Sequence, residues 1–372
     1  MKHSLTKLST ILFFILILIS CTHKNNEKNL LYKVSTINIA IDDSTDNTGG
    51  KLLIYVDKSS SNNYLCKYNN IRNSWDIYNL TTKKLFKIIR FNNNLLEYNG
   101  GLLIQNFNKI FAYDYNLNKL IVSDTSGKIY QIKDLSSMLK DNNTKYEASS
   151  ICCPIGIYQN SIFMEARAKL PPRQFYFGKC LFIYDLKKDT SFLTISFPNL
   201  YKYNKDFGKY AAAFNIVNNQ LIYSFEVDPN LYIYDLQGNL LKSINAKSNF
   251  LDKFDFLDST KEHDIKSFRE FNMAHGSYFN LIYDKYNKLF YRIIRHNMPL
   301  TDKNNKINDF LYADFSIIIL DKDLNIITEQ FFKGSIYDFS NIIPTNMGLL
   351  ISKNPKLDRE HIAFDIYKFK KD

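Results

Sequence analysis

The sequence of 372 residues lacks the short motifs that identify many enzyme classes. It has no Gly-x-Ser-x-Gly segment and no glycine-rich phosphate-binding loop, which argues against a nucleophile-elbow hydrolase and a nucleotide-binding enzyme. Residues 358–361 (Asp-Arg-Glu-His) lack the helical histidine spacing of zinc peptidases, so we expect a turn before the last strand there. Carboxylate pairs for glycoside cleavage would come from different parts of the chain and cannot be recognised by spacing.

Cysteine is scarce, with five residues in the whole chain. No pair has metal-ligand spacing with histidine support, and we expect no metal and no cofactor. Adjacent Cys152 and Cys153 have α-carbons closer than an ordinary disulfide tolerates, so we expect any bridge to join Cys180 to one of them. The alternative, equally open, is that these residues and Cys66 are small buried thiols.

Runs of a single charge are also absent. Lys and Arg total 48 against 37 Asp and Glu, but they are spread among Asn, Asp and Ser. No basic helix is visible, so we expect no nucleic-acid partner. A solvated basic surface explains the excess charge, while attraction to anionic glycans or headgroups stays open.

The N-terminus has the layout of an export signal, with Lys2 and Lys7 followed by a short apolar run. Residues 18–21 (Leu-Ile-Ser-Cys) resemble the lipobox of bacterial lipoproteins, which implies that Cys21 becomes the acylated first residue after cleavage. We therefore expect a signal peptide at residues 1–20, a polar tether at 21–30 and a membrane partner through the lipid on Cys21. An uncleaved membrane anchor would need a longer apolar run. Thr22 follows the cysteine and no Asp signals inner-membrane retention, so we expect the outer membrane or periplasm, with surface exposure left open.

Residues 231–244 predict one β-hairpin, because strand-forming residues flank a polar turn. Asp235 stands first in the turn, where its carboxylate can accept backbone N–H groups. Gly238 stands three residues on, where a positive φ is needed. Full or looser copies of this pattern recur at residues 75–79, 120–130, 181–185 and 317–321.

These hairpins belong to larger units of short strands. The units span residues 51–91, 95–132, 151–197, 211–244 and 276–332, with a shorter one from 336 onward. In the first unit we expect strands at 52–56, 64–68, 74–79 and 84–90. Residues 250–271 interrupt the spacing, and we expect one or two helical turns there.

Repeats of roughly 40 to 50 residues are typical of four-stranded propeller blades. The short last unit lacks a strand, which residues 31–39 would supply, closing the ring and removing its open edges. We predict an all-β fold, a six-bladed β-propeller closed by the N-terminal strand, in one domain over residues 31–372. An irregular pair of β-sandwiches is the alternative, but it does not explain units of four strands.

Residues 281–292 and 348–352, with the lipobox and the six units, resemble an uncharacterised family of bacterial lipoproteins with a six-bladed propeller fold. The chain is similar more broadly to propellers with NHL-type and YWTD-type blades. The resemblance implies location and fold, and it brings no catalytic residues.

Propeller ligands bind over the central channel, which makes Arg292, Arg295, His296 and His275 the first candidate cluster. An Arg in the channel could hold a carboxylate or sulfate through two parallel hydrogen bonds. Residues three apart on a plain strand face opposite sides, so only one of the two Arg side chains could line the channel. The alternative is that Arg292 pairs with an Asp of a neighbouring turn and holds blades together.

A second candidate group surrounds the double proline at residues 171–172, where Arg167 and Arg173 could form a rim contact site. The alternative is a solvated connection stiffened by proline. Tyr176 and Tyr201, expected at loop tips, could stack on sugars.

We therefore expect a lipid-anchored, monomeric cell-envelope propeller that binds a peptide, glycan or partner protein without catalysis. The alternative is a hydrolase or lyase acting on polysaccharide or peptide at the central channel. Three or more convergent ionisable groups in the channel would favour the enzyme, and an apolar channel would favour the binder.

Overall fold

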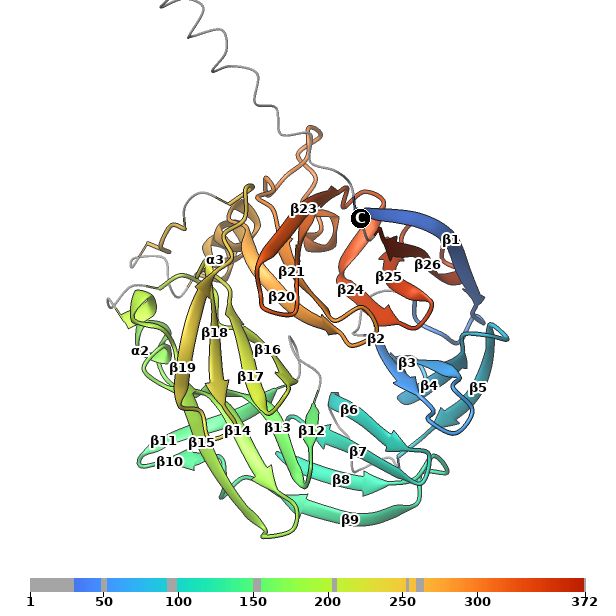
Figure 1. Cartoon of the computed structure of the whole chain (residues 1–372), viewed down its shortest axis with the longest axis horizontal. Coiled ribbons are helices and arrows are strands. Elements are labelled where there is room, and N and C mark those ends of the chain that lie inside the picture. The colour runs from blue at the N-terminus through green and yellow to red at the C-terminus, as the bar shows by residue number, and fades with distance from the viewer. Residues whose placement is uncertain are drawn as a thin grey trace, which may run out of the picture.

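Six antiparallel sheets surround a common axis in the computed structural model, which describes residues 30–47, 52–91, 99–149, 155–202, 206–251, 254–258 and 264–370. Figure 1 shows the sheets arranged as the blades of a wheel. The predicted six-bladed β-propeller is confirmed, and the sandwich alternative is wrong.

Blades 1 to 6 follow the order of the chain, and in every blade except blade 3 the first strand lies nearest the axis (Figure 1). Blade 1 consists of β2 (Leu52–Val56), β3 (Asn63–Asn69), β4 (Ser74–Asn79) and β5 (Lys84–Ile89). Blade 2 consists of β6 (Asn99–Asn106), β7 (Lys109–Asp114), β8 (Lys119–Ser123) and β9 (Ile129–Asp134). Blade 3 consists of β10 (Lys140–Asp141), β11 (Thr144–Ser149), β12 (Gly156–Tyr158), β13 (Ser161–Ala168), β14 (Lys179–Asp185) and β15 (Thr190–Ser196). Blade 4 consists of β16 (Ala212–Val217), β17 (Gln220–Phe225), β18 (Asn230–Asp235) and β19 (Leu240–Asn245). Blade 5 consists of β20 (Ser277–Asp284), β21 (Leu289–Arg295), β22 (Phe315–Leu320) and β23 (Ile326–Phe332). Blade 6 consists of β24 (Tyr337–Thr345), β25 (Gly348–Lys353), β26 (His361–Phe369) and β1 (Leu31–Ala40).

The N-terminal strand closes the ring, as predicted. β1 pairs antiparallel with β26, from Leu31 opposite Phe369 to Ala40 opposite His361, and supplies the outermost strand of blade 6 (Figure 1). The side-chain amide of Gln330 on β23 both donates to and accepts from the backbone of Leu31, at 3.0 Å each. β1 is therefore held by blade 5 as well as by blade 6.

The recurring turn has the expected geometry. The Asp235 carboxylate accepts the N–H groups of Gln237 and Asn239, and Gly238 has a φ of 88°. In blade 3 the Asp185 carboxylate also accepts two backbone N–H groups, those of Lys187 and Lys188, two and three residues on. The turn after the first strand of each blade except blade 3, and the turn between β12 and β13 in blade 3, lie on one face of the wheel, which we call the turn face.

Longer connections carry the helices on the opposite face, the loop face. These are α2 (Pro172–Phe175), η1 (Asn199–Lys202), α3 (Ile265–Ala274) and η3 (Phe310–Tyr312). The helical insertion before blade 5 is confirmed, but α3 begins later than expected and is longer. Asp264 starts it by accepting the N–H groups of Lys266 and Ser267.

Blade 3 begins earlier than the predicted boundary at residue 151. β11 and β12 both pair with β13, so the position of its first strand is filled by two segments. β10 adds a short strand beyond β11.

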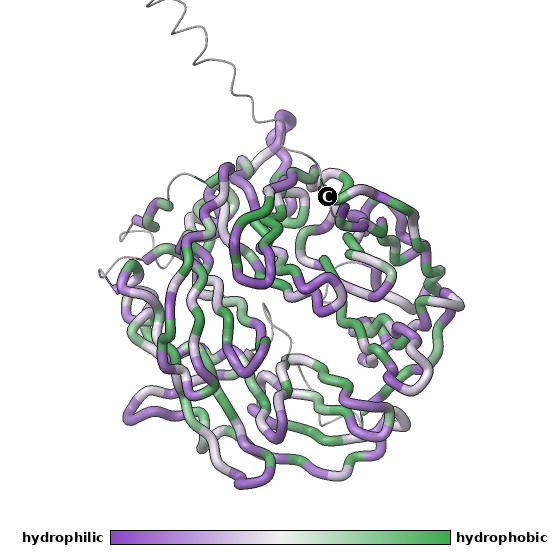
Figure 2. Tube along the Cα trace, viewed as in Figure 1, coloured by the Kyte–Doolittle hydropathy of each residue, from purple (hydrophilic) through white to green (hydrophobic). Residues whose placement is uncertain are grey.

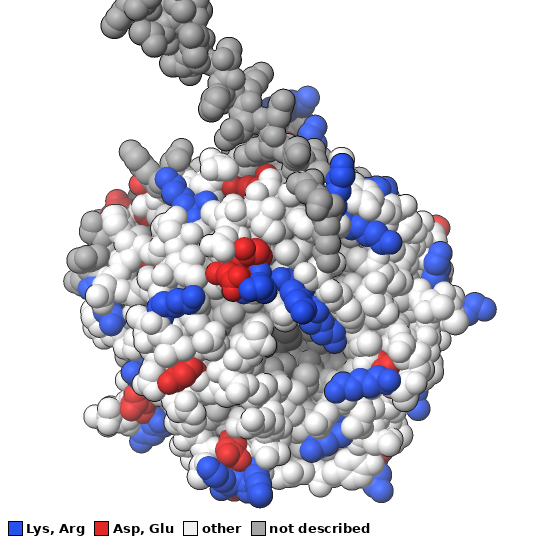
Figure 3. All heavy atoms as spheres, in the orientation of Figure 1, with Lys and Arg blue, Asp and Glu red and all other residues white. Residues whose placement is uncertain are grey.

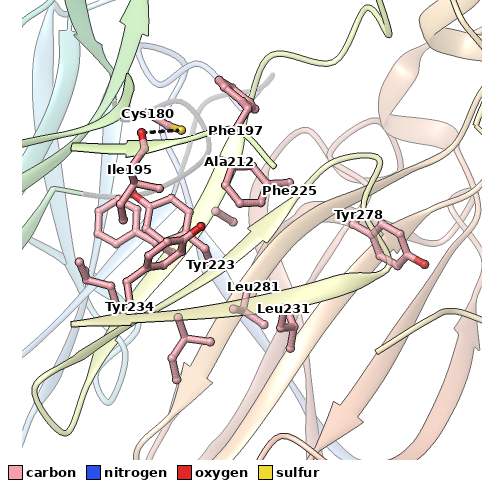
Figure 4. Close-up of a cluster of buried hydrophobic side chains, with 14 of the residues drawn as sticks. Cys180, Ile195, Phe197, Ala212, Tyr223, Phe225, Leu231, Tyr234, Tyr278 and Leu281 are labelled. Carbon is pink, nitrogen blue, oxygen red and sulfur yellow. Dashed lines mark hydrogen bonds between the residues drawn. The ribbon is translucent and has the colours of Figure 1, made fainter. Parts of the chain in front are cut away.

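Hydrophobic clusters fill the spaces between neighbouring blades. Figure 2 shows hydrophobic stretches along the strands and hydrophilic stretches at the outer turns. Figure 4 shows the largest cluster, which joins blades 3, 4 and 5 through residues such as Tyr223, Phe225 and Leu281. Tyr176 and Tyr201 are buried beside this cluster, at 0% and 1% exposure, so the expectation that they lie at loop tips is wrong.

Candidate ligand site in the central channel

Arg292 on β21 is fully buried between blades 4 and 5. Its guanidinium donates to Ser224 Oγ at 3.0 Å and to the carbonyls of Pro229, Ala246 and Asp228 at 2.6–2.9 Å. These contacts favour the alternative in which Arg292 holds blades together. Its partners are carbonyl oxygens of blade 4 instead of the expected Asp carboxylate.

Arg295, at the end of the same strand, is also buried and serves the C-terminal end of α3. Its guanidinium donates to the carbonyls of Asn272, Met273 and His275. Lys209 reaches the same end of α3, donating from Nζ to Asn272 Oδ1 at 2.7 Å. Burial lowers the pKa of Lys209 to about 7. Arg295 thus places a positive charge at the unpaired carbonyls and negative dipole end of a helix, and Lys209 donates a further hydrogen bond there.

The two histidines of the first cluster lie apart from the channel lining. His275 follows α3, where its Nδ1 lies 2.8 Å from the Phe271 carbonyl and its Nε2 lies 3.2 Å from Asp255 Oδ2. His296 lies against the ring of Phe250, and its Nε2 lies 3.0 Å from Ser316 Oγ. Burial lowers the pKa of His296 to about 4.

Arg167, from the second predicted group, is not among the residues that line the channel cavity. Arg167 on β13 forms an ion pair with Glu165, with 3.0 Å between Nε and Oε1. Arg173 lies in α2, and its side chain is outside the described part of the structure. Asp358 and His361 form the turn that leads into β26, as expected, and the His361 ring lies 2.9 Å from the carboxylate.

Cys66 and Cys180 are free buried thiols. The Cys180 thiol donates to the Ile195 carbonyl at 3.3 Å (Figure 4), so the bridge predicted for Cys180 is not formed. Cys152 and Cys153 lie outside the described residues. Burial raises the pKa of the Cys66 thiol to about 12, which makes it a poor nucleophile.

The central channel contains a cavity of about 340 Å³ between the first strands of five blades. The lining is aliphatic with a few amide and hydroxyl groups, and no ionisable side chain is among these residues: Leu52, Leu53, Ile155, Gly156, Ile157, Phe214, Asn215, Ile216, Asn280, Leu281, Ile282, Ser340, Asn341, Ile342, Ile343 and Pro344. Mostly apolar cavities with few placed polar groups, at this size or larger, are typical of small-ligand sites.

Three asparagines line this cavity, one from each of blades 4, 5 and 6. Asn215 donates to the Leu281 carbonyl at 2.8 Å and accepts the Tyr283 N–H at 3.1 Å, and so joins blade 4 to blade 5. Asn341 accepts the Leu52 N–H at 2.8 Å and joins blade 6 to blade 1. Within the described part of the chain, Asn280 makes no such bond to a neighbouring blade.

Sequence reasoning missed these asparagines, although a signal was present. Phe-Asn-Ile-Val at residues 214–217 and Phe-Asn-Leu-Ile at 279–282 are the same pattern, and Phe-Ser-Asn-Ile-Ile at 339–343 is a version with one inserted residue.

Metal ligands do not gather in the described residues, where no group of three or more His, Cys, Asp or Glu side chains could hold an ion. Of the helices described, none has the length and apolar composition needed to cross a membrane.

The fold and this cavity define a six-bladed β-propeller with a ligand-sized space on its axis, whose described lining residues carry no charge. Residues 27–331 match the family described as Domain of unknown function (DUF4221), and the chain belongs to that family. No curated protein matches the chain.

Two solved structures share the fold. A DUF4221 family member from Bacteroides vulgatus is 19% identical, with a TM-score of 0.77 and coverage of 92% of this chain and 98% of that one. A protein from Bacteroides fragilis, named as a putative exported protein, is 9% identical, with a TM-score of 0.56 and coverage of 94% of this chain and 98% of that one.

Proposed function

We propose that this chain is a lipid-anchored cell-envelope propeller that binds a ligand in its central channel without catalysing a reaction. The observation that carries the proposal is the uncharged lining of the channel cavity, contributed by five blades. General acid–base chemistry needs positioned ionisable groups, and the described lining offers none. The charged candidates Arg292 and Arg295 are engaged in holding blades and α3 together.

The surface around the channel supports the same proposal. In Figure 3 the Lys, Arg, Asp and Glu side chains are scattered around a central hollow and form no continuous patch of one sign. A neutral or weakly charged ligand fits such a surface better than a polyanion does.

The proposed location rests on the lipobox-like residues 18–21 and on the protein of similar fold that is named as a putative exported protein. Lipidation at Cys21 would place the propeller on a membrane surface through the tether at residues 21–30. Lipoprotein processing adds more than one acyl chain, which stable anchoring requires.

Fractionation of cells that express Cys21→Ala tests the anchor. We expect the wild-type chain in the membrane fraction and the variant in the soluble fraction, because the variant has no thiol to acylate. A variant that stays membrane-bound to the same extent would contradict the anchor. Screening the Cys21→Ser chain on peptide and glycan arrays tests the binding function, and binding to neither array would contradict it.

A further inference from the structure

Asn280 differs from the two other asparagines of the channel in what its amide does. Its Oδ1 accepts the N–H of its own neighbour, Leu281, at 2.8 Å. Its Nδ2 donates no hydrogen bond to any group in the described part of the chain. A donor at the wall of a mostly apolar cavity is therefore available to a ligand.

Asn215 shows what an asparagine in this position can hold. It follows Phe214 as Asn280 follows Phe279, and its amide holds the backbone of a neighbouring strand through one donated and one accepted bond. An asparagine amide has two donors and an acceptor with two lone pairs, so it matches the donor and acceptor of a peptide group.

A backbone irregularity explains why Asn280 is not used in the same way. The register of β20 against β21 shifts between Tyr278 and Asn280, leaving Phe279 as an extra residue. Phe279 packs against Phe339 and Phe310, between blades 5 and 6. A bulge of this kind re-aims the side chains beside it, and bulges are frequent next to functional sites.

The remaining lining restricts the chemistry of the ligand. Isoleucine or leucine side chains reach the cavity from β2, β12, β16, β20 and β24. A charged group would lose its hydration there with no opposite charge among the described lining residues. Aliphatic groups would be stabilised, at about 0.8 kcal/mol for each CH₂ removed from water.

From these observations, and resting on the proposed binding function, we propose that the channel binds an uncharged aliphatic peptide segment whose backbone carbonyl accepts the Asn280 Nδ2 hydrogen bond. Asn280 then forms the hydrogen bond to the ligand backbone, and the aliphatic wall of the cavity favours ligands with apolar side chains.

Calorimetry with defined peptides tests this inference. The full chain carrying Cys21→Ser is titrated with acetylated, amidated tripeptides of Ala, Val and Leu, and with versions that contain one Asp or one Lys. We expect the neutral peptides to bind and each charged version to bind at least tenfold more weakly.

Asn280→Ala should weaken binding of the neutral peptides by about tenfold, because the ligand carbonyl loses its partner in a desolvated site. It should leave Tm unchanged, since Asn280 joins no blades. Asn354→Ala is the matched control outside the channel: it removes the bond to the Gly334 carbonyl. We expect it to lower Tm by roughly 2–4 °C and leave the affinity unchanged.

The outcomes separate the inference from the proposed function. Equal affinity of wild type and Asn280→Ala would overturn the role of Asn280. Binding of glycans but of no peptide on the arrays would overturn the peptide class while the binding function stands. Binding to neither array would overturn the proposed function itself.

Discussion

Gly238 and Leu324 occupy the same position of the recurring turn, where the backbone has a positive φ, and they tolerate it for different reasons. Gly238 has a φ of 88°, and a Cβ there would lie 2.1 Å from Thr194 Oγ1 on the neighbouring blade. Leu324 accepts the left-handed conformation at a φ of 68° and is 2% exposed. Burial of a leucine side chain, worth about 1.5–3 kcal/mol, offsets the strain of a positive φ.

His296 is the residue whose protonation should be visible in stability. Its pKa is about 4 in the folded chain because of burial, against about 6.5 when unfolded. Asp314 opposes this shift and Arg295 adds to it. Between these values the unfolded chain binds more protons than the folded chain, so the free energy of unfolding falls as pH is lowered from 6.5 to 4.

Replacing His296 should remove that dependence. Between pH 6.5 and 4 we expect the free energy of unfolding to fall less in His296→Gln than in wild type. The difference should be on the order of 1–2 kcal/mol, a figure that allows for solvent screening of this partly exposed group. Urea unfolding at pH 7, 5.5 and 4 measures the difference. Parallel pH profiles of the two proteins would show that His296 is not the group responsible.

Among the elements, α3 depends on blades 4 and 5 for its C-terminal end. Lys209 precedes β16, and Arg295 ends β21, so one cation from each blade reaches the helix. Helices this short are marginal alone, and tertiary contacts must hold them in place.

Arg295→Met should loosen α3 selectively. We expect hydrogen exchange of the amides in residues 265–274 to speed up by at least tenfold, since several carbonyls lose a charged donor at once. Hydrogen exchange with mass spectrometry measures this, with exposed Arg269→Met on the same helix as control. Equal acceleration in both variants would mean that Arg295 does not anchor the helix.

Elements were predictable where the local pattern decides the structure. β2 and β4 have the expected bounds, because strand-forming residues such as Ile, Tyr, Val and Trp are followed by polar turns. β10 and β11 were missed, because four of their eight residues are Lys, Asp or Glu, which are depleted in strands. These two segments form strands because they pair with each other and with β13, and not because their residues favour strands.

The channel site was not predictable from the sequence in the same way. Reasoning from ionisable residues led to Arg292 and Arg295, whose partners are carbonyls that only the fold brings together. Asn is frequent in the turns of this chain, so Asn280 within a strand did not stand out.

At the scale of the whole molecule, ring closure depends on ten residues that immediately follow the predicted tether. Ile37 and Ile39 are buried between blades 6 and 1, and Leu31 is buried between blades 5 and 6. Backbone pairing and buried side chains thus link the start of the chain to three blades.

Two truncated chains distinguish the contribution of the tether to stability from that of the closing strand. A chain starting at Leu30 should keep the wild-type Tm, because it retains β1. A chain starting at Ile41 loses four buried aliphatic side chains at about 1.5–3 kcal/mol each and exposes β26 as an unpaired edge. A loss on the order of 5 kcal/mol is comparable to the whole stability of many domains, so we expect this chain to unfold or aggregate. Circular dichroism melting and size-exclusion chromatography distinguish the two chains, and an unchanged Tm for the shorter one would mean that the wheel holds together without its closing strand.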